Sequence, residues 1–410
     1  MAGKRVIVFT NHFYPENFRI NDVAFFLAKE NYQITVLTCI PNYPTGKYFK
    51  GYGIFQKRKE VIAGVTVIRI PMISRGNGKA FRLFLNYFSY AFFLSIKTFF
   101  LSFGEKYEFV LVHHTSPIFL GVPAVLLKKR QKAKLIFWNL DLWPESVQAA
   151  SKVTNQLVYR ILNKMVNFIY LNSDHFLISS KGFVHSMMDK GADTNKITYF
   201  PNWAEDVYIS NIENSSSALP LKGRTNFFFK VMYAGNIGES QDVENIFNTI
   251  KEVYVSNKKI KWTLVGDGRK KDWLKKEVER NSLSQNVEFL GNLPVEQLPE
   301  LIKSADAMLV TLKNSYIFSI TIPAKIQAYM ASQKPILGML DGAGADIIND
   351  AQCGATCPSG DHKSLTFNVL KLSNMKTDQL QEIGRNGFNY YEENFSKEVT
   401  FEKLLNLLKA

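Results

Sequence analysis

The sequence predicts an α/β protein with two doubly wound parallel sheets, one in each half of the chain. The first observation is a repeated order of apolar strand, polar loop, helix and second strand. This order occurs at Val6–Thr10, Asp22–Glu30 and Gln33–Cys39, and again at Phe228–Ala234, Asp242–Ser256 and Lys261–Val265. The second observation is the length of 410 residues, which exceeds what one hydrophobic core usually serves. Each half is therefore expected to form its own domain.

Further elements continue this pattern in both halves. The apolar runs are Phe109–Val112, Leu135–Asn139, Val287–Leu290, Ala307–Thr311 and Pro335–Leu340, with helices such as Gln156–Asn172 and Pro323–Ser332 between them. Residues 206–226 include Asn-Ser-Ser-Ser and Leu-Pro-Leu-Lys-Gly without apolar periodicity, which predicts a linker. The expected domains are 1–205 and 227–390. A final helix at 391–410 is expected to pack back toward the first domain.

The positive charge of the chain lies in its first half. Residues 1–205 contain 26 Lys and Arg against 12 Asp and Glu, whereas residues 206–410 contain 24 of each. A one-sided positive field favours an anionic partner such as phosphate, nucleic acid or an anionic lipid surface. The densest cluster is Lys128–Lys134, which could equally be a solvated helix end. No nucleic-acid-binding motif accompanies the charge, so no nucleic acid partner is expected.

The three cysteines, Cys39, Cys353 and Cys357, are too few and too scattered for a disulfide framework. They match no metal-ligand spacing that includes partner histidines. The sequence therefore predicts a reducing compartment, no metal and no cofactor.

Two segments bear on localisation. The first residues, Lys4–Thr10, look like a short strand rather than a signal peptide, which predicts a cytoplasmic protein. The segment Phe81–Phe103 holds ten aromatic residues in twenty-three, interrupted by Arg82, Asn86 and Lys97. These interruptions predict that it does not span a membrane. It is either a buried core helix or a helix that lies in the lipid headgroup layer.

A glycine-rich turn follows the first strand of the second half. Gly235, Asn236, Ile237, Gly238 and Gln241 lie between this strand and the next helix. Glycines in such a turn let backbone N–H groups approach a phosphate, and the helix N-terminus adds a partial positive charge. The same glycines could serve only tight packing.

Later strands of the second half also end in turns that could reach a ligand. Gly266-Asp267-Gly268 closes one strand, and Phe289-Leu290-Gly291 closes another. After the next strand, Thr321 or Ile322 is expected to cap a helix with Pro323 in its first turn. Lys325 would then lie beside that helix N-terminus, where it could pair with phosphate.

These segments together resemble the retaining GT-B glycosyltransferases of family 4, and in particular the O-antigen and colanic-acid type that includes lipid-linked N-acetylfucosamine transferases. The resemblance rests on Tyr14–Phe18, Pro41–Lys47, Asp141–Ser146, Pro201–Trp203, Gly235–Gln241 and Ile322–Pro335, in this order and spacing. It implies two Rossmann-like domains facing a cleft. The first domain binds the acceptor and the second binds a UDP-sugar. Transfer retains the anomeric configuration without a metal.

The chain departs from the family pattern at the donor loop. The usual arginine and lysine of this loop are replaced by Asn236 and Gln241, which leaves Lys325 as the main cation for the diphosphate. The usual pair of glutamates is replaced by Ile320 and Ala328 or, with a shift of one residue, by Ser319 and Gln327. Lining by Tyr316, Phe318, Ser319 and Ile320 would suit a donor sugar with fewer hydroxyls, such as an N-acetyl-deoxyhexosamine.

The first half offers the acceptor site and the remaining chemistry. The loop after the first strand carries His12, Glu16 and Arg19, although Glu16 could be a helix cap and Arg19 a surface cation. Asp141 and Glu145 follow another strand and could deprotonate or orient the acceptor hydroxyl, unless the leaving diphosphate takes its proton. Of His113 and His114, one could be catalytic and the other packed. The expected catalytic residues are Glu16, Asp141, Glu145 and His113, and the expected acceptor contacts are His12, Tyr14, Arg19, Asn42, Tyr43, Lys47 and Trp143.

The resemblance further implies an acceptor sugar linked to polyprenyl diphosphate. The basic first half and the aromatic segment would then hold the protein peripherally on the anionic inner membrane, with binding that weakens at high salt. An alternative function is a sugar-nucleotide epimerase of the same two-domain fold, which would need no acceptor. A nucleic-acid-binding module would explain the basic half but not the glycine turns.

Overall fold

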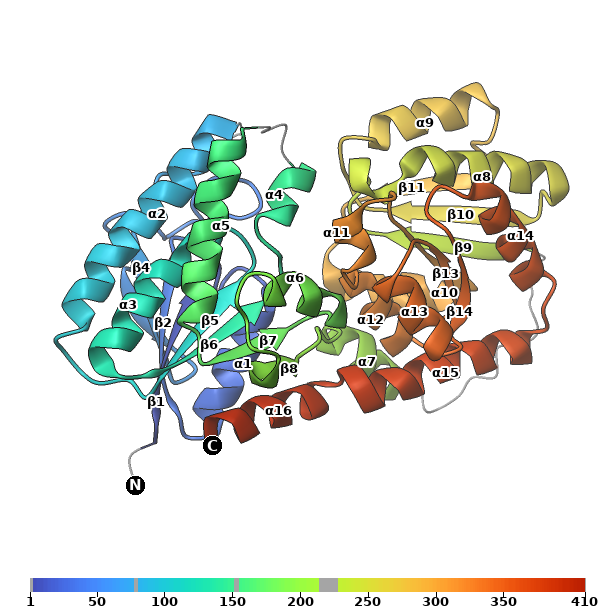
Figure 1. Ribbon diagram of the computed structural model, residues 1–410. Helices are drawn as coiled ribbons and strands as arrows, with labels where there is room; N and C mark the ends of the chain where they lie inside the picture. Colours follow the sequence, from blue (N-terminus) through green and yellow to red (C-terminus); the bar gives the residue numbers. More distant parts are fainter. Residues whose placement is uncertain (1–2, 77–79, 151–154, 214–227, 410) are drawn as a thin grey trace. The chain divides into compact units, whose positions relative to one another are not determined.

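The computed structural model describes residues 3–76, 80–150, 155–213 and 228–409 (Figure 1). These residues form two compact α/β units. Unit 1 contains Met1–Phe200 together with Lys403–Ala410, and unit 2 contains Pro201–Glu402. The two parallel-sheet units confirm the predicted fold class of two Rossmann-like domains.

Unit 1 is built on a sheet of eight strands in the order β3-β4-β2-β1-β5-β6-β7-β8. Only the pair of β3 and β4 is antiparallel. The order reverses between β1 and β5, which is where an open parallel sheet places its ligand crevice. The strands are β1 (Arg5–Thr10), β2 (Gln33–Cys39), β3 (Lys59–Ile62), β4 (Val65–Ile70), β5 (Phe109–His114), β6 (Lys134–Asn139), β7 (His175–Ile178) and β8 (Ile197–Tyr199).

The helices of unit 1 cover the sheet. They are α1 (Arg19–Lys29), α2 (Ala80–Leu101), α3 (Gly121–Gln131), α4 (Glu145–Ala150), α5 (Gln156–Leu171) and α6 (Val184–Met188). Short 3-10 turns occur at Ile118–Leu120, Lys181–Phe183 and Thr194–Lys196. Figure 1 shows α2, α3 and α5 side by side, and α3 packs against both of its neighbours.

Unit 2 is built on a fully parallel sheet of six strands in the order β11-β10-β9-β12-β13-β14. This order reverses between β9 and β12. The strands are β9 (Phe229–Ala234), β10 (Ile260–Val265), β11 (Val287–Gly291), β12 (Ala307–Thr311), β13 (Ile336–Met339) and β14 (Gly354–Cys357).

The remaining helices lie in unit 2, except that α16 begins in unit 2 and ends in unit 1. They are α7 (Asp206–Glu213), α8 (Val243–Ser256), α9 (Lys271–Arg280), α10 (Leu298–Ser304), α11 (Tyr316–Ser319), α12 (Ala324–Ala331), α13 (Ala343–Asp350), α14 (His362–Ser373), α15 (Thr377–Phe395) and α16 (Lys397–Lys409). Short 3-10 turns occur at Glu239–Gln241 and Val295–Gln297.

Two predicted boundaries differ from the structure. The expected linker 206–226 begins with helix α7, because its first residues pack on α10 and α12; residues 214–226 lie outside the described residues. The expected terminal helix 391–410 is the end of α15 followed by α16. The last residues belong to unit 1, where the Lys4 ammonium donates to the Leu408 carbonyl at 2.8 Å, so the two chain ends lie close together (Figure 1).

Helix α2 corresponds to the aromatic segment predicted from the sequence. By length and composition alone, its residues Arg82–Leu101 could cross a membrane, although the sequence prediction was that three polar interruptions exclude this. One side of the helix is fastened to unit 1: the Tyr90 hydroxyl donates to the Thr10 carbonyl at 2.7 Å, and the Asn86 amide donates to the Ile73 carbonyl at 2.6 Å. The helix is therefore neither fully buried nor free of the domain.

Candidate active site

The ligand crevice expected from the strand order of unit 2 lies where the β9–α8 and β12–α12 connections meet. The Thr311 hydroxyl, at the end of β12, donates to the Gln241 carbonyl of the β9–α8 loop at 2.5 Å. The Gly235 N–H donates to the Val265 carbonyl at 2.8 Å, which joins the same loop to β10. The predicted glycine turns therefore converge at the reversal point of the sheet.

The glycines of these turns serve two different purposes. A Cβ on Gly266 would lie 1.9 Å from the Gly235 carbonyl oxygen, and one on Gly268 would lie 2.3 Å from the Ile237 carbonyl oxygen. Both therefore allow backbone to pack on backbone, as in the packing alternative. A Cβ on Gly235 would instead meet the Lys325 side chain, with its Cε at 2.7 Å and its Nζ at 3.0 Å. Only Gly235 makes room for a cation.

Lys325 is the central cation of this crevice. Its ammonium lies 3.8 Å from the centroid of the Tyr233 ring, and no carboxylate among the described residues pairs with it. Loss of solvent around the amine lowers the pKa of Lys325 from 10.5 to about 7. A desolvated cation without a carboxylate partner is suited to an anionic ligand.

The neighbouring cations are already paired with glutamates. Lys270 lies 2.6 Å from Glu244 and 3.4 Å from Glu239, and Lys313 lies 3.4 Å from Glu239. The Lys270 partners raise the pKa of this lysine, through the hydrogen bond to Glu244 first. These ion pairs were not predicted, because the residues come from different loops and turns.

The polar tip of the glycine loop is occupied by its own side chains. The side-chain oxygen Oε1 of Gln241 accepts from the Asn236 side-chain amide and from the Gly238 N–H, both at 3.2 Å. Asn236 and Gln241 therefore shape the loop through their own hydrogen bonds. Ile237 is buried, and its N–H donates to the Asp267 carbonyl. The Asp267 carboxylate accepts from the Gly268 N–H, which lowers its pKa.

Helix α12 begins one residue later than predicted. Pro323 is its N-cap, and Ala324 is its first residue, because Pro323 has an extended backbone conformation. Thr321 donates to the Ile317 carbonyl at 2.6 Å rather than capping α12, and Ile322 is buried.

Of the alternative residues for the missing glutamates, two are excluded by burial. Gln327 is fully buried, and its amide nitrogen satisfies the Pro323 and Ala324 carbonyls at 3.1 and 3.3 Å. Ala328 is also buried. The predicted donor contact of Gln327 is therefore wrong. Ser319, the last residue of α11, and Ile320, which follows it, are half-buried, and Phe289 and Leu290 are half-buried on β11.

The crevice of unit 1 lies at the ends of β1, β2 and β5. Glu16 is buried there, and both of its carboxylate oxygens are occupied. One accepts from the Asn42 and Tyr43 N–H groups at 2.7 and 2.6 Å, and the other lies 2.8 Å from His12 Nδ1. Glu16, predicted as catalytic, therefore orients His12 and joins two loops.

His12 is held on three sides. Its ring stacks on Phe18 with centroids 4.5 Å apart and planes 8° apart, and Tyr43 lies 5.3 Å away. With Nδ1 directed at Glu16, the imidazole presents Nε2 as its remaining polar atom.

A small cavity adjoins His12. Its volume is about 20 Å³, enough for one water-sized group, and its lining consists of Asn11, His12, Cys39, Asn42, Met72, Arg75, Asn86, Tyr87 and Tyr90. Asn11 and Asn42 each donate their amide nitrogen to a backbone carbonyl, at 2.7 and 2.9 Å. Their side-chain oxygens are buried without a partner. The two oxygens can accept hydrogen bonds from a ligand hydroxyl or a water.

The other predicted acceptor contacts surround this cavity unevenly. Tyr43 is exposed, with the Arg75 guanidinium 5.5 Å from its ring centroid. Tyr14 and Lys47 are exposed, and Arg19 is the half-buried first residue of α1. Arg75, Asn11, Asn86, Tyr87 and Tyr90 were missed; the position of Arg75, soon after the apolar run that forms β4, was the one available signal.

The carboxylates after β6 differ in environment. Asp141 accepts from the Leu142 N–H at 2.9 Å and from the Ser146 hydroxyl at 3.0 Å, yet loss of solvent raises the pKa of Asp141 to about 6. Glu145 forms an ion pair with Lys190 and accepts from the Ser186 hydroxyl. Asp141 remains a candidate base, whereas Glu145 is engaged by a cation.

Two predicted site residues, His113 and Trp143, are packed in the interior of unit 1, as is the neighbouring His114. His113 is buried, its Nδ1 lies 2.9 Å from the Thr10 hydroxyl, and burial lowers its pKa to about 3. His114 is also buried, with its pKa lowered to about 4, so neither histidine reaches the surface. Trp143 is buried, and its indole N–H donates to the Ser116 hydroxyl at 3.1 Å. The predicted catalytic role of His113 and the acceptor contact of Trp143 are corrected accordingly.

The described residues contain no group of three or more His, Cys, Asp and Glu side chains that could hold a metal ion. All three cysteines are buried free thiols.

Comparison with known families bears on unit 2. The family model described as "Glycosyl transferases group 1" matches residues 229–375. These residues include β9 to β14, the glycine loop and Lys325. Unit 2 is therefore similar to the group 1 glycosyltransferases over its whole sheet.

Two curated relatives extend the similarity into unit 1. The probable glycosyltransferase WbjE of Pseudomonas aeruginosa is 25% identical over 340 residues, which cover 81% of this chain and 79% of that protein. The putative colanic acid biosynthesis glycosyl transferase WcaI of Escherichia coli (strain K12) is 22% identical over 341 residues, which cover 80% and 81%. Both relatives are described as glycosyltransferases, and the epimerase alternative receives no support.

A solved structure resembles nearly the whole chain. The structure described as "Trehalose-6-phosphate from E. coli bound with UDP-2-fluoro glucose" has a TM-score of 0.72 at 12% identity and covers 99% of each chain. At this identity the likeness concerns the fold, and it agrees with the predicted GT-B class.

Proposed function

We propose that this chain is a retaining, metal-independent glycosyltransferase of bacterial O-antigen or capsular polysaccharide synthesis. It transfers N-acetyl-L-fucosamine, or a related N-acetyl-deoxyhexosamine, from a UDP-sugar to a sugar linked to polyprenyl diphosphate. The relatives described for colanic acid and as a probable glycosyltransferase support this pathway class, and the E. coli structure bound with a UDP-sugar analogue supports the donor class.

The observation that carries the proposal is Lys325 in its glycine-lined position. Its amine is desolvated, lies against Gly235 and has no carboxylate partner among the described residues, whereas Lys270 and Lys313 are neutralised by glutamates. A diphosphate placed here would provide the missing negative charge. Lys325 would then also stabilise the leaving UDP as the glycosidic bond breaks.

The donor sugar is proposed to lie near α11. Tyr316 is exposed, and Phe318, Ser319 and Ile320 are half-buried in the same turn. Gln327 is turned inward, so no carboxylate or amide stands at that position to bind sugar hydroxyls. A sugar that lacks a 6-hydroxyl would leave the polar groups of a more polar site unpaired. This less polar lining therefore favours such a sugar.

The acceptor is proposed to bind in unit 1 beside His12. Arg75 offers a cation for the acceptor diphosphate, and the unpaired oxygens of Asn11 and Asn42 accept from acceptor hydroxyls. The acceptor hydroxyl attacks the anomeric carbon as the bond to the diphosphate oxygen breaks. Its proton passes either to the leaving diphosphate or to Asp141, whose raised pKa suits a base near neutral pH.

The protein is proposed to act on the cytoplasmic face of the inner membrane. The excess positive charge of residues 1–205 and the exposed phenylalanines of α2 support attraction to an anionic lipid surface. Sedimentation with anionic vesicles at low salt and partial release at high salt is expected, since screening weakens charge attraction. A protein that stays wholly in the supernatant at low salt would contradict this localisation.

A thermal-shift panel of UDP, GDP, dTDP and CMP tests the donor, because a ligand that binds only the folded state raises the melting temperature. UDP is expected to give the largest shift, unchanged by EDTA. A transfer assay then compares UDP-N-acetyl-L-fucosamine with UDP-glucose, each with and without a lipid-linked acceptor. Equal use of UDP-glucose would exclude the proposed donor class, and conversion of the sugar without acceptor would restore the epimerase alternative.

A further inference from the structure

The surface formed by α2, α3 and α5 has an unusual distribution of side chains. On α2 an exposed apolar stripe recurs every three or four residues, at Phe84, Phe88, Phe92, Ile96 and Phe99, and Phe103 continues it in the turn after the helix. The opposite side, which packs on the domain, carries the polar residues Asn86, Ser89 and Thr98 as well as the apolar residues Tyr90 and Leu94. The exposed side is therefore apolar, whereas a helix on a water-exposed surface normally has a polar outer side. An exposed apolar stripe of this length indicates an interaction surface.

The charged residues of α2, α3 and α5 are all cationic. Their described segments contain no Asp or Glu, whereas Arg82, Lys97, Lys128, Lys129, Arg130, Arg160 and Lys164 all lie on them. Apolar side chains are also exposed on α5, at Leu157, Ile161, Phe168 and Leu171. A surface that combines exposed apolar groups with one sign of charge is complementary to an anionic lipid bilayer.

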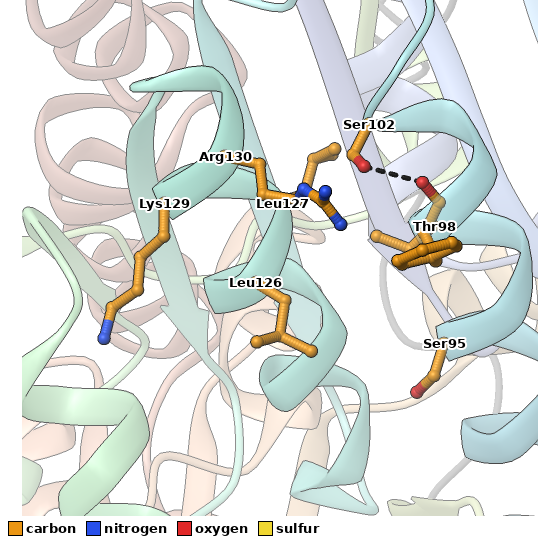
Figure 2. Close-up of a pocket in the computed structure, with 8 residues that line it drawn as sticks. Ser95, Thr98, Ser102, Leu126, Leu127, Lys129 and Arg130 are labelled. Carbon is orange, nitrogen blue, oxygen red and sulfur yellow. Dashed lines mark hydrogen bonds between the residues drawn. The ribbon is translucent and has the colours of Figure 1, made fainter.

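A groove opens into this surface between α2 and α3 (Figure 2). Its volume is about 230 Å³, and its lining consists of Ser95, Thr98, Phe99, Ser102, Leu126, Leu127, Lys129 and Arg130. Figure 2 shows the residues of α2 on one side and those of α3 on the other, with the Arg130 side chain extending toward α2. This volume is below the roughly 300–1,000 Å³ of a site that encloses a whole small molecule. It suits a single chain that enters from outside.

Two cations lie at this groove without carboxylate partners in the described part of the chain. The Arg130 guanidinium lies 4.3 Å from the Phe103 ring centroid and 5.0 Å from that of Phe99, so aromatic rings hold it in place. Lys129 extends to the other side of α3, 5.4 Å from the Phe168 ring. Lys128, in contrast, is already paired with Asp174.

From these observations we propose that the groove between α2 and α3 binds one molecule of an anionic glycerophospholipid. One acyl chain lies between Leu126 and the Ser95–Phe99 side of α2, and the lipid phosphate pairs with Arg130. This site rests on the proposed membrane association and adds a defined lipid to it. A phosphate beside an apolar slot matches the chemistry of such a lipid.

The acceptor tail is a less suitable occupant of this groove. Asn86 of α2 lines the cavity beside His12, whereas Thr98 of the same helix lines the groove. Twelve residues of α-helix separate them by about 18 Å. The acceptor diphosphate is assigned to Arg75 near the cavity, so Arg130 is left for a second phosphate.

The test uses a short-chain lipid below its micelle concentration, so that no bilayer is present. Calorimetric titration of the full-length protein with dihexanoyl phosphatidylglycerol is expected to show binding of one molecule, with dihexanoyl phosphatidylcholine about tenfold weaker because of its neutral headgroup. No binding of the monomeric anionic lipid would overturn the proposal. Tighter binding of a short prenyl diphosphate in competition would also overturn it, in favour of the acceptor tail.

Matched variants separate the groove from the general apolar surface. Ser95→Phe fills the slot and is expected to weaken phosphatidylglycerol binding about tenfold or more, and Arg130→Gln to remove the preference for the anionic lipid. Phe84→Ser with Phe88→Ser, which changes the stripe outside the groove, is expected to reduce vesicle binding while monomer binding changes less than about twofold. Unchanged affinity in Ser95→Phe would overturn the proposal. The UDP thermal shift, measured in parallel, reports folding and the donor function separately.

Discussion

The two crevices lie at equivalent points of their sheets but are prepared for opposite kinds of ligand. In unit 2, between β9 and β12, backbones are packed together by glycines around Lys325, a cation that lacks a carboxylate partner among the described residues. In unit 1, between β1 and β5, the charge of Glu16 is satisfied internally, and the unpaired atoms are the amide oxygens of Asn11 and Asn42. Unit 2 therefore offers a cation that needs a negative charge, which a diphosphate supplies. Unit 1 offers acceptors that need hydrogen-bond donors, which the hydroxyls of a sugar supply.

The largest expected effect is on UDP binding, from the loss of Lys325 in unit 2. Lys325→Met removes the unpaired cation while keeping a side chain of similar length, and it is expected to weaken UDP binding about 100-fold. The matched control is Lys313→Met at the end of β12, whose charge is already neutralised by Glu239. Its UDP affinity is expected to change less than about threefold. Calorimetric titration measures both, and equal losses in the two variants would show that the pairing does not matter.

The next effect concerns the unit 1 side. Glu16→Gln replaces a carboxylate that accepts two backbone N–H groups and faces His12, so the orientation of the imidazole is lost. Transfer to the acceptor is expected to fall about tenfold or more, while UDP affinity stays unchanged. Glu30→Gln, at the exposed end of α1, serves as the control. A parallel loss of UDP affinity in Glu16→Gln would contradict the separation of the two sites.

The pH dependence of activity tests both units, because one titrating group lies in each unit. Asp141 has its pKa raised to about 6, so activity is expected to rise with pH as this carboxyl ionises. Lys325 has its pKa lowered to about 7, so UDP affinity is expected to fall above pH 7 as the amine loses its proton. Together they predict a narrow bell with its maximum between these values.

Each limb of the bell has its own variant. Asp141→Asn is expected to remove the acidic limb of the transfer rate, and Lys325→Met the basic limb of UDP affinity. Persistence of the acidic limb in Asp141→Asn would assign the acceptor proton to the leaving diphosphate.

The smallest effect on activity is expected for a histidine that the sequence favoured. His113→Asn removes a buried, neutral ring next to Trp138, so transfer per folded molecule is expected to change less than about twofold. Unfolding free energy is expected to fall by about 1–3 kcal/mol, because a buried hydrogen bond with Thr10 is disturbed. Chemical denaturation and steady-state assays of the same sample separate these quantities. Activity lost without loss of stability would return His113 to the active site.

Much of the secondary structure and the fold class could be predicted from the sequence alone. Strand and helix periodicity is local, so the alternation of strands and helices in both halves, the position of the Gly235 turn and the place of Lys325 near the start of α12 could be predicted. The strands β3, β4, β7, β8 and β14 were missed. The resemblance to glycosyltransferases could likewise be read from short motifs in their order along the chain.

Which of these groups are available to a ligand depends on tertiary packing and could not be predicted from the sequence. The ion pair of Lys270 with Glu244, the contact of Glu16 with His12 and the cavity that joins Asn11 to Arg75 depend on side-chain directions across several loops. His113, Trp143 and Gln327 are buried, so they do not contact a ligand as the sequence predicted. Local sequence specifies which residues end a strand, whereas charge pairing and desolvation are properties of the packed neighbourhood, and these decide the chemistry at each strand end.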